Sequence, residues 1–202
     1  MTPEYRIPVV CGEPDWSRVE KAPIACYKWG RDYMPVSYAQ CAFLPDRGLA
    51  VKLTSYESAP KAVYGTYGSP VYKDSCLEFF ASFDPRSAKY MNFEMNSNGA
   101  YLSSVRTDKT DKKPIDALTD ELPDVKCEKG DGFWSVEVLF TAKFISDCFD
   151  GTVLAPGSVF RGNFYKCGDE TDIPHYGSWA PIDNPTPSFH LPAFFGTLVI
   201  DG

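Results

Sequence analysis

The chain has 202 residues, of which 44% are apolar and 15% aromatic, so it can bury a sizeable core as one domain. Its 20 basic residues against 27 acidic ones give a net charge of −7, which offers no cationic surface for nucleic acid or an anionic membrane. No apolar run approaches the roughly 20 residues of a membrane span. A neutral ligand is compatible with this balance.

The first 35 residues contain five prolines, and we expect them to be irregular apart from a short opening strand near Tyr5–Val10. No export signal is visible at the start of the chain. The seven cysteines are widely spaced and form no C-x-x-C pair, which favours small, mostly buried side chains over a disulfide framework or a zinc knuckle. This usage favours a reducing, cytoplasmic compartment; an extracellular location is the alternative if a signal has been removed.

The remaining elements are mostly short strands. Two β-rich runs, 36–44 and 48–57, flank a Pro-Asp-Arg-Gly turn and predict a hairpin. The tyrosine-rich segment 58–73 is typical of an ordered binding loop, or of a loop that covers a sheet edge. A charged turn is expected at 107–114 and a connection or short strand at 115–132. Further strands are expected at 74–83, 90–99, 100–106, 133–140, 159–167 and 196–201, with one short helix at 142–149 capped by Thr141.

This pattern predicts an all-β fold, an antiparallel two-sheet β-sandwich of jelly-roll type with one short helix and long loops. We see no domain boundary and expect a single domain over residues 1–202.

The segments 74–83 and 90–99 alternate, so each presents two different faces. In the second, Met91, Phe93 and Met95 point one way and are expected in the core. The opposite face carries Asn92, Glu94 and Asn96, which are poor strand formers with well-defined hydrogen-bonding groups. In the first segment, Glu78 lies on the face opposite Leu77 and Phe79. These rows predict a prepared hydrogen-bonding surface.

Polar side chains on neighbouring strands could meet the vicinal hydroxyls of a sugar with paired hydrogen bonds. The candidates are Glu78, Glu94, Asn96, Arg161 and Asn163. The alternative is a buried network that ties the strands together.

Aromatic side chains at strand ends could stack on a pyranose ring. The candidates are Tyr72, Trp179 and Phe189; core or loop packing is favoured for Phe189, and sugar stacking for Trp179. His175, with Lys166 nearby, is expected to be structural, with direct sugar contact as the second choice. His175 and His190 do not make a metal motif, and Cys167 with His175 lacks the third group of a catalytic triad.

Several unusual motifs occur together and in order: DSCLEFF, YMNFEMNSNG, FW followed by VEV, RGNFYKCGDE, PHYGSW and FHLPAFFG. From about Val36 to Ile200 the chain thereby resembles the family 9-like carbohydrate-binding modules, relatives of the dopamine β-monooxygenase N-terminal-like sandwiches. The resemblance implies a β-sandwich that holds a mono- or oligosaccharide without catalysis, in association with bacterial polysaccharide or oligosaccharide degradation.

The resemblance also implies roles for individual residues. Tyr72 and Trp179 would take the places of the family's two clamping tryptophans, and Glu78 matches its glutamate. Glu94 stands where the family has an arginine, and Arg161 could supply that charge. Known members carry structural calcium, although no calcium-loop pattern is present here, and no cofactor is implied. The full set of expected carbohydrate-binding residues is Tyr72, Glu78, Glu94, Asn96, Arg161, Asn163, Lys166, His175 and Trp179.

Two other functions stay open at this point. Glu78 and Glu94 could act as acid and base in a glycoside hydrolase. Some relatives of the sandwich bind haem, for which Met91 or Met95 with His175 or His190 would be the candidates. Because both methionines fall on the expected core face, the haem hypothesis is the less favoured of the two.

Overall fold

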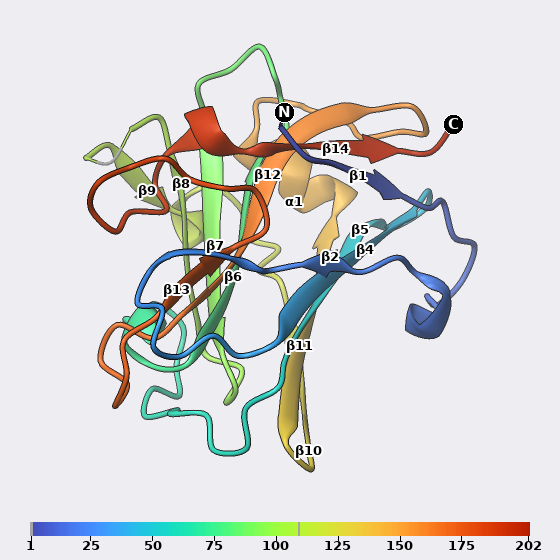
Figure 1. Cartoon of the computed structure of the whole chain (residues 1–202). Helices are drawn as coiled ribbons and strands as arrows, with labels where there is room; N and C mark the ends of the chain where they lie inside the picture. Colours follow the sequence, from blue (N-terminus) through green and yellow to red (C-terminus); the bar gives the residue numbers. More distant parts are fainter. Residues whose placement is uncertain (1, 109) are drawn as a thin grey trace.

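The computed structural model describes residues 2–108 and 110–202 and shows two β-sheets packed face to face (Figure 1). The larger sheet has nine strands, in the order β1-β14-β12-β6-β7-β8-β9, with β13 and β3 branching from β12. Its strands are β1 (Glu4–Ile7), β3 (Cys26–Trp29), β6 (Cys76–Ser82), β7 (Tyr90–Asn96), β8 (Tyr101–Arg106), β9 (Lys112–Pro114), β12 (Val159–Cys167), β13 (Tyr176–Ser178) and β14 (Gly196–Ile200). This confirms the predicted sandwich. The strand pairs of the larger sheet are antiparallel except that β1 runs parallel to β14.

The smaller sheet has five strands in the order β10-β11-β5-β4-β2. They are β2 (Ala22–Pro23), β4 (Ser37–Leu44), β5 (Gly48–Ser55), β10 (Val125–Gly130) and β11 (Phe133–Thr141). The predicted hairpin joins β4 to β5 with Leu44 opposite Gly48. Gly48 has a φ of +135°, and a Cβ there would lie 2.1 Å from the carbonyl oxygen of Phe140, so only glycine fits this turn.

The core lies between the sheets and follows the predicted alternation. Met91, Phe93 and Met95 are fully buried there, together with Phe79 of the neighbouring strand. The single helix, α1 (Ala142–Cys148), begins after Thr141, whose hydroxyl accepts a hydrogen bond from the Phe144 amide as expected for an N-cap. Its buried residues close the sandwich beside β11.

Two segments differ from the expectation. The lead segment is more regular than its prolines suggest, because β2 and β3 pair with β4 and β13. Residues 115–132 contain the short strand that was one of the two expectations, β10. The charged turn at 107–114 ends in β9, while residue 109 lies outside the described residues.

All seven cysteines are free thiols; four are buried and one is half-buried, while Cys11 and Cys127 are exposed. No helix formed by the described residues combines the length and the apolarity required to cross a membrane.

Candidate functional site

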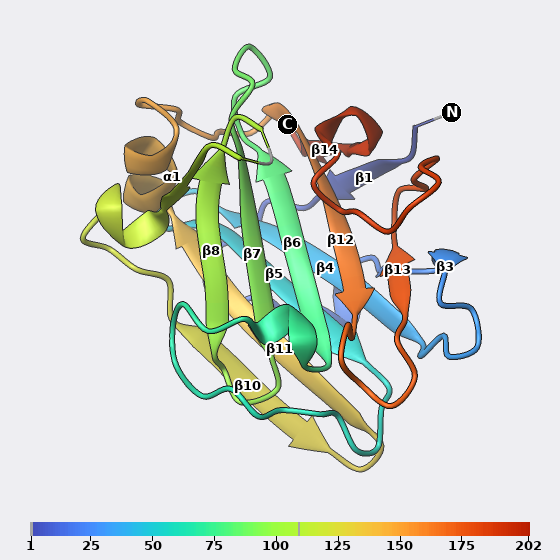
Figure 2. The ribbon, with the colours of Figure 1, turned by 90° about the vertical axis from the view of Figure 1, so that its left-hand side faces the viewer.

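A pocket of about 680 Å³ lies on the outer face of the larger sheet. Figure 2 looks onto this face, with β8, β7, β6 and β12 side by side from left to right and the other sheet behind them. Sheet residues Glu78, Phe80, Glu94 and Arg106 line the pocket, and the loop residues around Tyr72 and Phe189 border it. The volume is in the range of small-molecule binding sites.

Three carboxyl groups line this pocket, those of Glu78, Glu94 and Asp169, and the first two face each other on neighbouring strands. Glu78 of β6 and Glu94 of β7 are directly opposite each other in the register, and they are only 2% and 4% exposed. Burial raises the pKa of Glu94 to about 7. The pKa of Glu78 is raised well above its usual value, mainly by burial and further by the neighbouring Cys167 and Glu94. Burial therefore favours the neutral form of Glu78, while Glu94 is close to half ionised at neutral pH.

An amide group donates a hydrogen bond to Glu94, and a guanidinium lies nearby. Asn92 Nδ2 donates to Glu94 Oε1 at 2.9 Å, and Asn92 Oδ1 accepts from Arg106 Nε at 2.9 Å. The positive charge of Arg106 lowers the pKa of Glu94 and so offsets part of the burial effect. A guanidinium therefore does accompany the carboxyls, but it is Arg106 of β8 and not the expected Arg161.

The second oxygen of Glu94 has no partner. Four buried side-chain polar atoms among the described residues make no hydrogen bond, and Glu94 Oε2 is the one that belongs to a pocket-lining residue. Because an unpaired buried acceptor costs about 1–3 kcal/mol, this atom marks where a ligand group would be stabilised.

Aromatic groups border the pocket. Phe189 is stacked on Tyr165 with ring centroids 4.1 Å apart and an angle of 7° between the planes. Tyr176 meets Phe189 edge-on, and Tyr72 is half-buried in the loop before β6. Phe189, for which packing alone was expected, both packs and lines the pocket.

Three of the expected polar residues are used in structural hydrogen bonds. Asn96 binds Asp74 Oδ2 and the carbonyl of Tyr64, which ties down the preceding loop. Asn163 exchanges hydrogen bonds with the backbone of Ala180, and Arg161 donates to the carbonyl of Phe195. None of the three lines the pocket. The expectation that they converge with Glu78 and Glu94 on a sugar is therefore wrong.

Lys166 and His175 lie on the opposite side of the sheet from the pocket. Lys166 is fully buried, opposite the core residue Leu77, with its ammonium 3.3 Å from Glu57 Oε2 and 2.8 Å from His175 Nε2. His175 Nδ1 lies 2.8 Å from the carbonyl oxygen of Ile173, so Nδ1 carries the proton and Nε2 accepts from the ammonium. Burial and the charge of Lys166 lower the pKa of His175 to about 4. These residues form an internal network, which agrees with the structural role favoured for His175. Neither lines the pocket, so the structure does not place them with the other expected carbohydrate-binding residues.

Trp179 is also absent from the pocket. It is 8% exposed and belongs to the main core, with its ring 5.6 Å from that of Phe164 and 6.3 Å from that of Tyr5. A Cβ on Gly196 would lie 2.2 Å from the indole, so the ring is seated directly on the backbone of β14. The structure corrects its expected stacking role, and of the nine expected residues it brings together Tyr72, Glu78 and Glu94.

These features are those of a polar, aromatic-bordered pocket on a β-sandwich. The sequence model described as carbohydrate-binding family 9 matches residues 14–200. The chain belongs to this family. No curated protein matches the chain.

Solved structures agree with membership of carbohydrate-binding family 9. A Bacteroides uniformis protein described as a candidate carbohydrate-binding protein is 25% identical and superposes with a TM-score of 0.84 over all of both chains. A family 9 module from Caldicellulosiruptor kristjanssonii in complex with cellotriose is 15% identical, with a TM-score of 0.69 over 99% of this chain and 94% of that one. The structure with glucose from the same organism is 16% identical, with a TM-score of 0.66 over 98% and 96%.

The closely grouped His, Cys, Asp and Glu side chains of the described residues do not offer a ligand set that suits the calcium implied by the family resemblance. Within residues 2–108 and 110–202, the one group of three or more His, Cys, Asp or Glu side chains close enough to share an ion is Cys76, Glu78 and Cys167. Calcium takes six to eight oxygen ligands, whereas this group offers two sulfur atoms and one carboxyl.

Proposed function

We propose that this family 9 chain binds a mono- or oligosaccharide in the pocket on the outer face of the larger sheet, as one non-catalytic binding unit. The unpaired Glu94 Oε2 at the pocket wall carries the proposal. Glucose and cellotriose, the ligands of the similar Caldicellulosiruptor structures, are the first sugars to test. Neither nucleic acid nor a membrane surface is an expected partner, because the net charge is −7.

The chemistry of the pocket suits a neutral polyol. A sugar hydroxyl can donate to the ionised form of Glu94 and can accept from the neutral form of Glu78, which burial favours. Arg106 adds a positive charge on the same wall. The rings of Tyr72 and Phe189 provide apolar surface on which the C–H faces of a pyranose can rest.

The arrangement of the carboxyls speaks against glycoside hydrolysis. Glycosidases place their two carboxyl groups on either side of the scissile bond. Glu78 and Glu94 are instead neighbours on adjacent strands and project from the same sheet face, so both would approach a sugar from one side. Incubation with labelled oligosaccharides should release no sugar, and any turnover that Glu78→Gln abolishes would contradict a purely binding role.

Replacing Glu94 by glutamine tests the proposal. The change keeps the volume but puts an amide where one carboxylate oxygen accepts a ligand hydroxyl. We expect the binding free energy to weaken by about 1.5–3 kcal/mol, the usual size of a hydrogen bond to a charged group. This corresponds to a roughly 10- to 150-fold rise in Kd, which calorimetry at pH 8, where Glu94 is mostly ionised, would measure.

Glu128→Gln is the matched control, because Glu128 is exposed on β10 of the other sheet. Its Kd should equal that of the wild type. Equal affinities of the Glu94 variant and the wild type would place the site elsewhere, and failure of the wild type to bind any sugar on a broad glycan array would remove the proposed function.

A further inference from the structure

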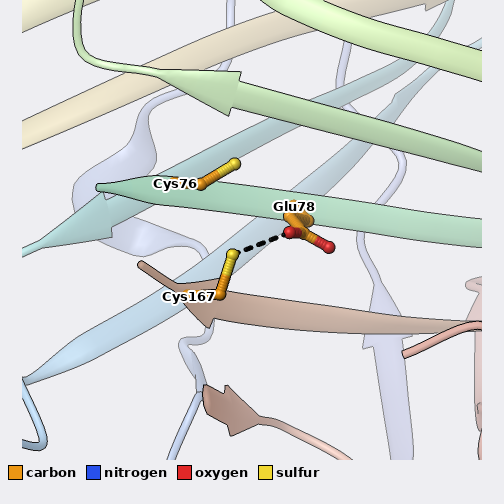
Figure 3. Close-up of side chains that lie close together, drawn as sticks. All are labelled: Cys76, Glu78 and Cys167. Carbon is orange, nitrogen blue, oxygen red and sulfur yellow. Dashed lines mark hydrogen bonds between the residues drawn. The ribbon is translucent and has the colours of Figure 1, made fainter. Parts of the chain in front are cut away.

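A cluster of two thiols and a carboxyl lies at the floor of the pocket. Cys76 of β6 and Cys167 of β12 are directly opposite each other in the register. Glu78 follows Cys76 by two residues and therefore projects from the same face of β6. Figure 3 shows the three side chains, with the sulfur of Cys167 directed at the carboxyl of Glu78. One ligand atom from each residue lies within 4.8 Å of the other two.

These distances suit a single small ion. Zinc binds thiolates at about 2.3 Å and carboxylates at about 2.0–2.2 Å, so neighbouring ligand atoms of a tetrahedral site are roughly 3.4–3.8 Å apart. Cys167 Sγ already lies 3.0 Å from Glu78 Oε1. Modest rotations of the side chains would therefore bring all three groups to zinc.

The donor set of the cluster suits a thiophilic metal ion. All three residues are buried, with exposures between 0% and 2%. A metal ion binds the deprotonated groups and releases their protons to water. Two sulfurs and one oxygen select zinc over calcium or magnesium.

A metal ion could reach the cluster from the pocket. Glu78 and Cys167 line the pocket, while Cys76, opposite Cys167 in the register, is fully buried. Three protein ligands with an open side are the arrangement of zinc sites that keep a fourth position for water or an exogenous oxygen. We propose that Cys76, Glu78 and Cys167 bind one zinc ion at the floor of the pocket, with its fourth coordination position open to the pocket.

Metal titration of the reduced protein tests this site without any sugar, so its outcome is independent of the proposed carbohydrate binding. The background should be Cys11→Ser/Cys127→Ser, which removes the two exposed thiols that could bind metal adventitiously. We expect one equivalent of Zn²⁺ to bind by calorimetry. Co²⁺, as an optical substitute, should give the near-ultraviolet absorption of thiolate-to-cobalt charge transfer.

In that background, Cys76→Ser and Cys167→Ser should each weaken Zn²⁺ binding by at least about 100-fold and remove the cobalt band. Cys41→Ser, which alters an equally buried thiol in the core, should leave both unchanged. Zinc affinity that is absent, or that survives both ligand substitutions, would overturn the proposal.

A second measurement needs no substitution at the site, so it tests the proposal even if the variants fail to fold. Bound Zn²⁺ should slow alkylation of Cys76 and Cys167 relative to Cys41, as read by peptide mass spectrometry. Equal protection of all three thiols would contradict the site. The proposal would also be contradicted if Cys76 and Cys167 were recovered as a disulfide and the protein still bound no Zn²⁺ after this disulfide was reduced.

Discussion

Trp179→Ala is expected to lower the free energy of unfolding by about 3–5 kcal/mol, the usual cost of truncating a large core aromatic. The indole packs against Phe164, Tyr5 and the backbone of Gly196, so its truncation would leave a cavity in the core. The sugar affinity of the remaining folded protein should be unchanged, because the ring does not line the pocket. Urea unfolding and a calorimetric sugar titration would measure the two effects separately.

Trp16→Ala is a suitable comparison, since Trp16 is only half-buried outside the core cluster and its indole nitrogen binds Glu137. Its loss of stability should be clearly smaller. If Trp179→Ala instead abolished sugar binding while the unfolding transition stayed in place, the indole would belong to the binding site after all.

Lys166→Met should be similarly costly, about 3–5 kcal/mol, because it leaves a buried carboxylate without its counter-ion. Burial alone would raise the pKa of Glu57, but the charge of Lys166 and the hydrogen bond from Trp134 Nε1 lower it overall, so the carboxylate is ionised when the pair is intact. Methionine fills the volume of the lysine stem but removes the charge and the hydrogen bonds of the ammonium to His175 and the Cys167 carbonyl. Chemical denaturation at neutral pH would measure the loss.

A surface pair provides the control. Lys52 lies 3.6 Å from Glu128 on the exposed side of the smaller sheet, and Lys52→Met should cost no more than about 1 kcal/mol. Adding Glu57→Gln to Lys166→Met should recover part of the lost stability, since the buried charge is then gone. Additive losses in the double variant would show that the two side chains do not stabilise each other.

The sequence predicted the strands of the sandwich and the faces of β6 and β7 well, because side chains on a strand alternate with a period of two. That rule alone placed Glu78 and Glu94 on the outer face and Met91 and Met95 in the core. Applied to β12, the same rule places Lys166 and Tyr165 on opposite faces of the strand. It therefore predicts that Lys166 lies on the inner side of the larger sheet.

Other parts of the site depend on register and on loop paths, which the sequence does not encode locally. Arg106 joins the site because β8 pairs with β7 so that Arg106 lies opposite Tyr90 and next to Asn92. Phe189 reaches the pocket through a long loop that packs onto Tyr165. The ring of Trp179 points inward because Gly196 of β14 has no side chain, so the indole can pack directly against its backbone. Contacts between segments far apart in the chain decide all three placements.

The binding site itself is tested most directly by a crystal structure of the protein grown with cellotriose. We expect a sugar ring over the outer face of the larger sheet, against Tyr72, with one hydroxyl within hydrogen-bonding distance of Glu94 Oε2. A saccharide bound instead in the separate pocket of about 290 Å³ beside Arg47 and Leu122, with the outer-face pocket empty, would contradict the account.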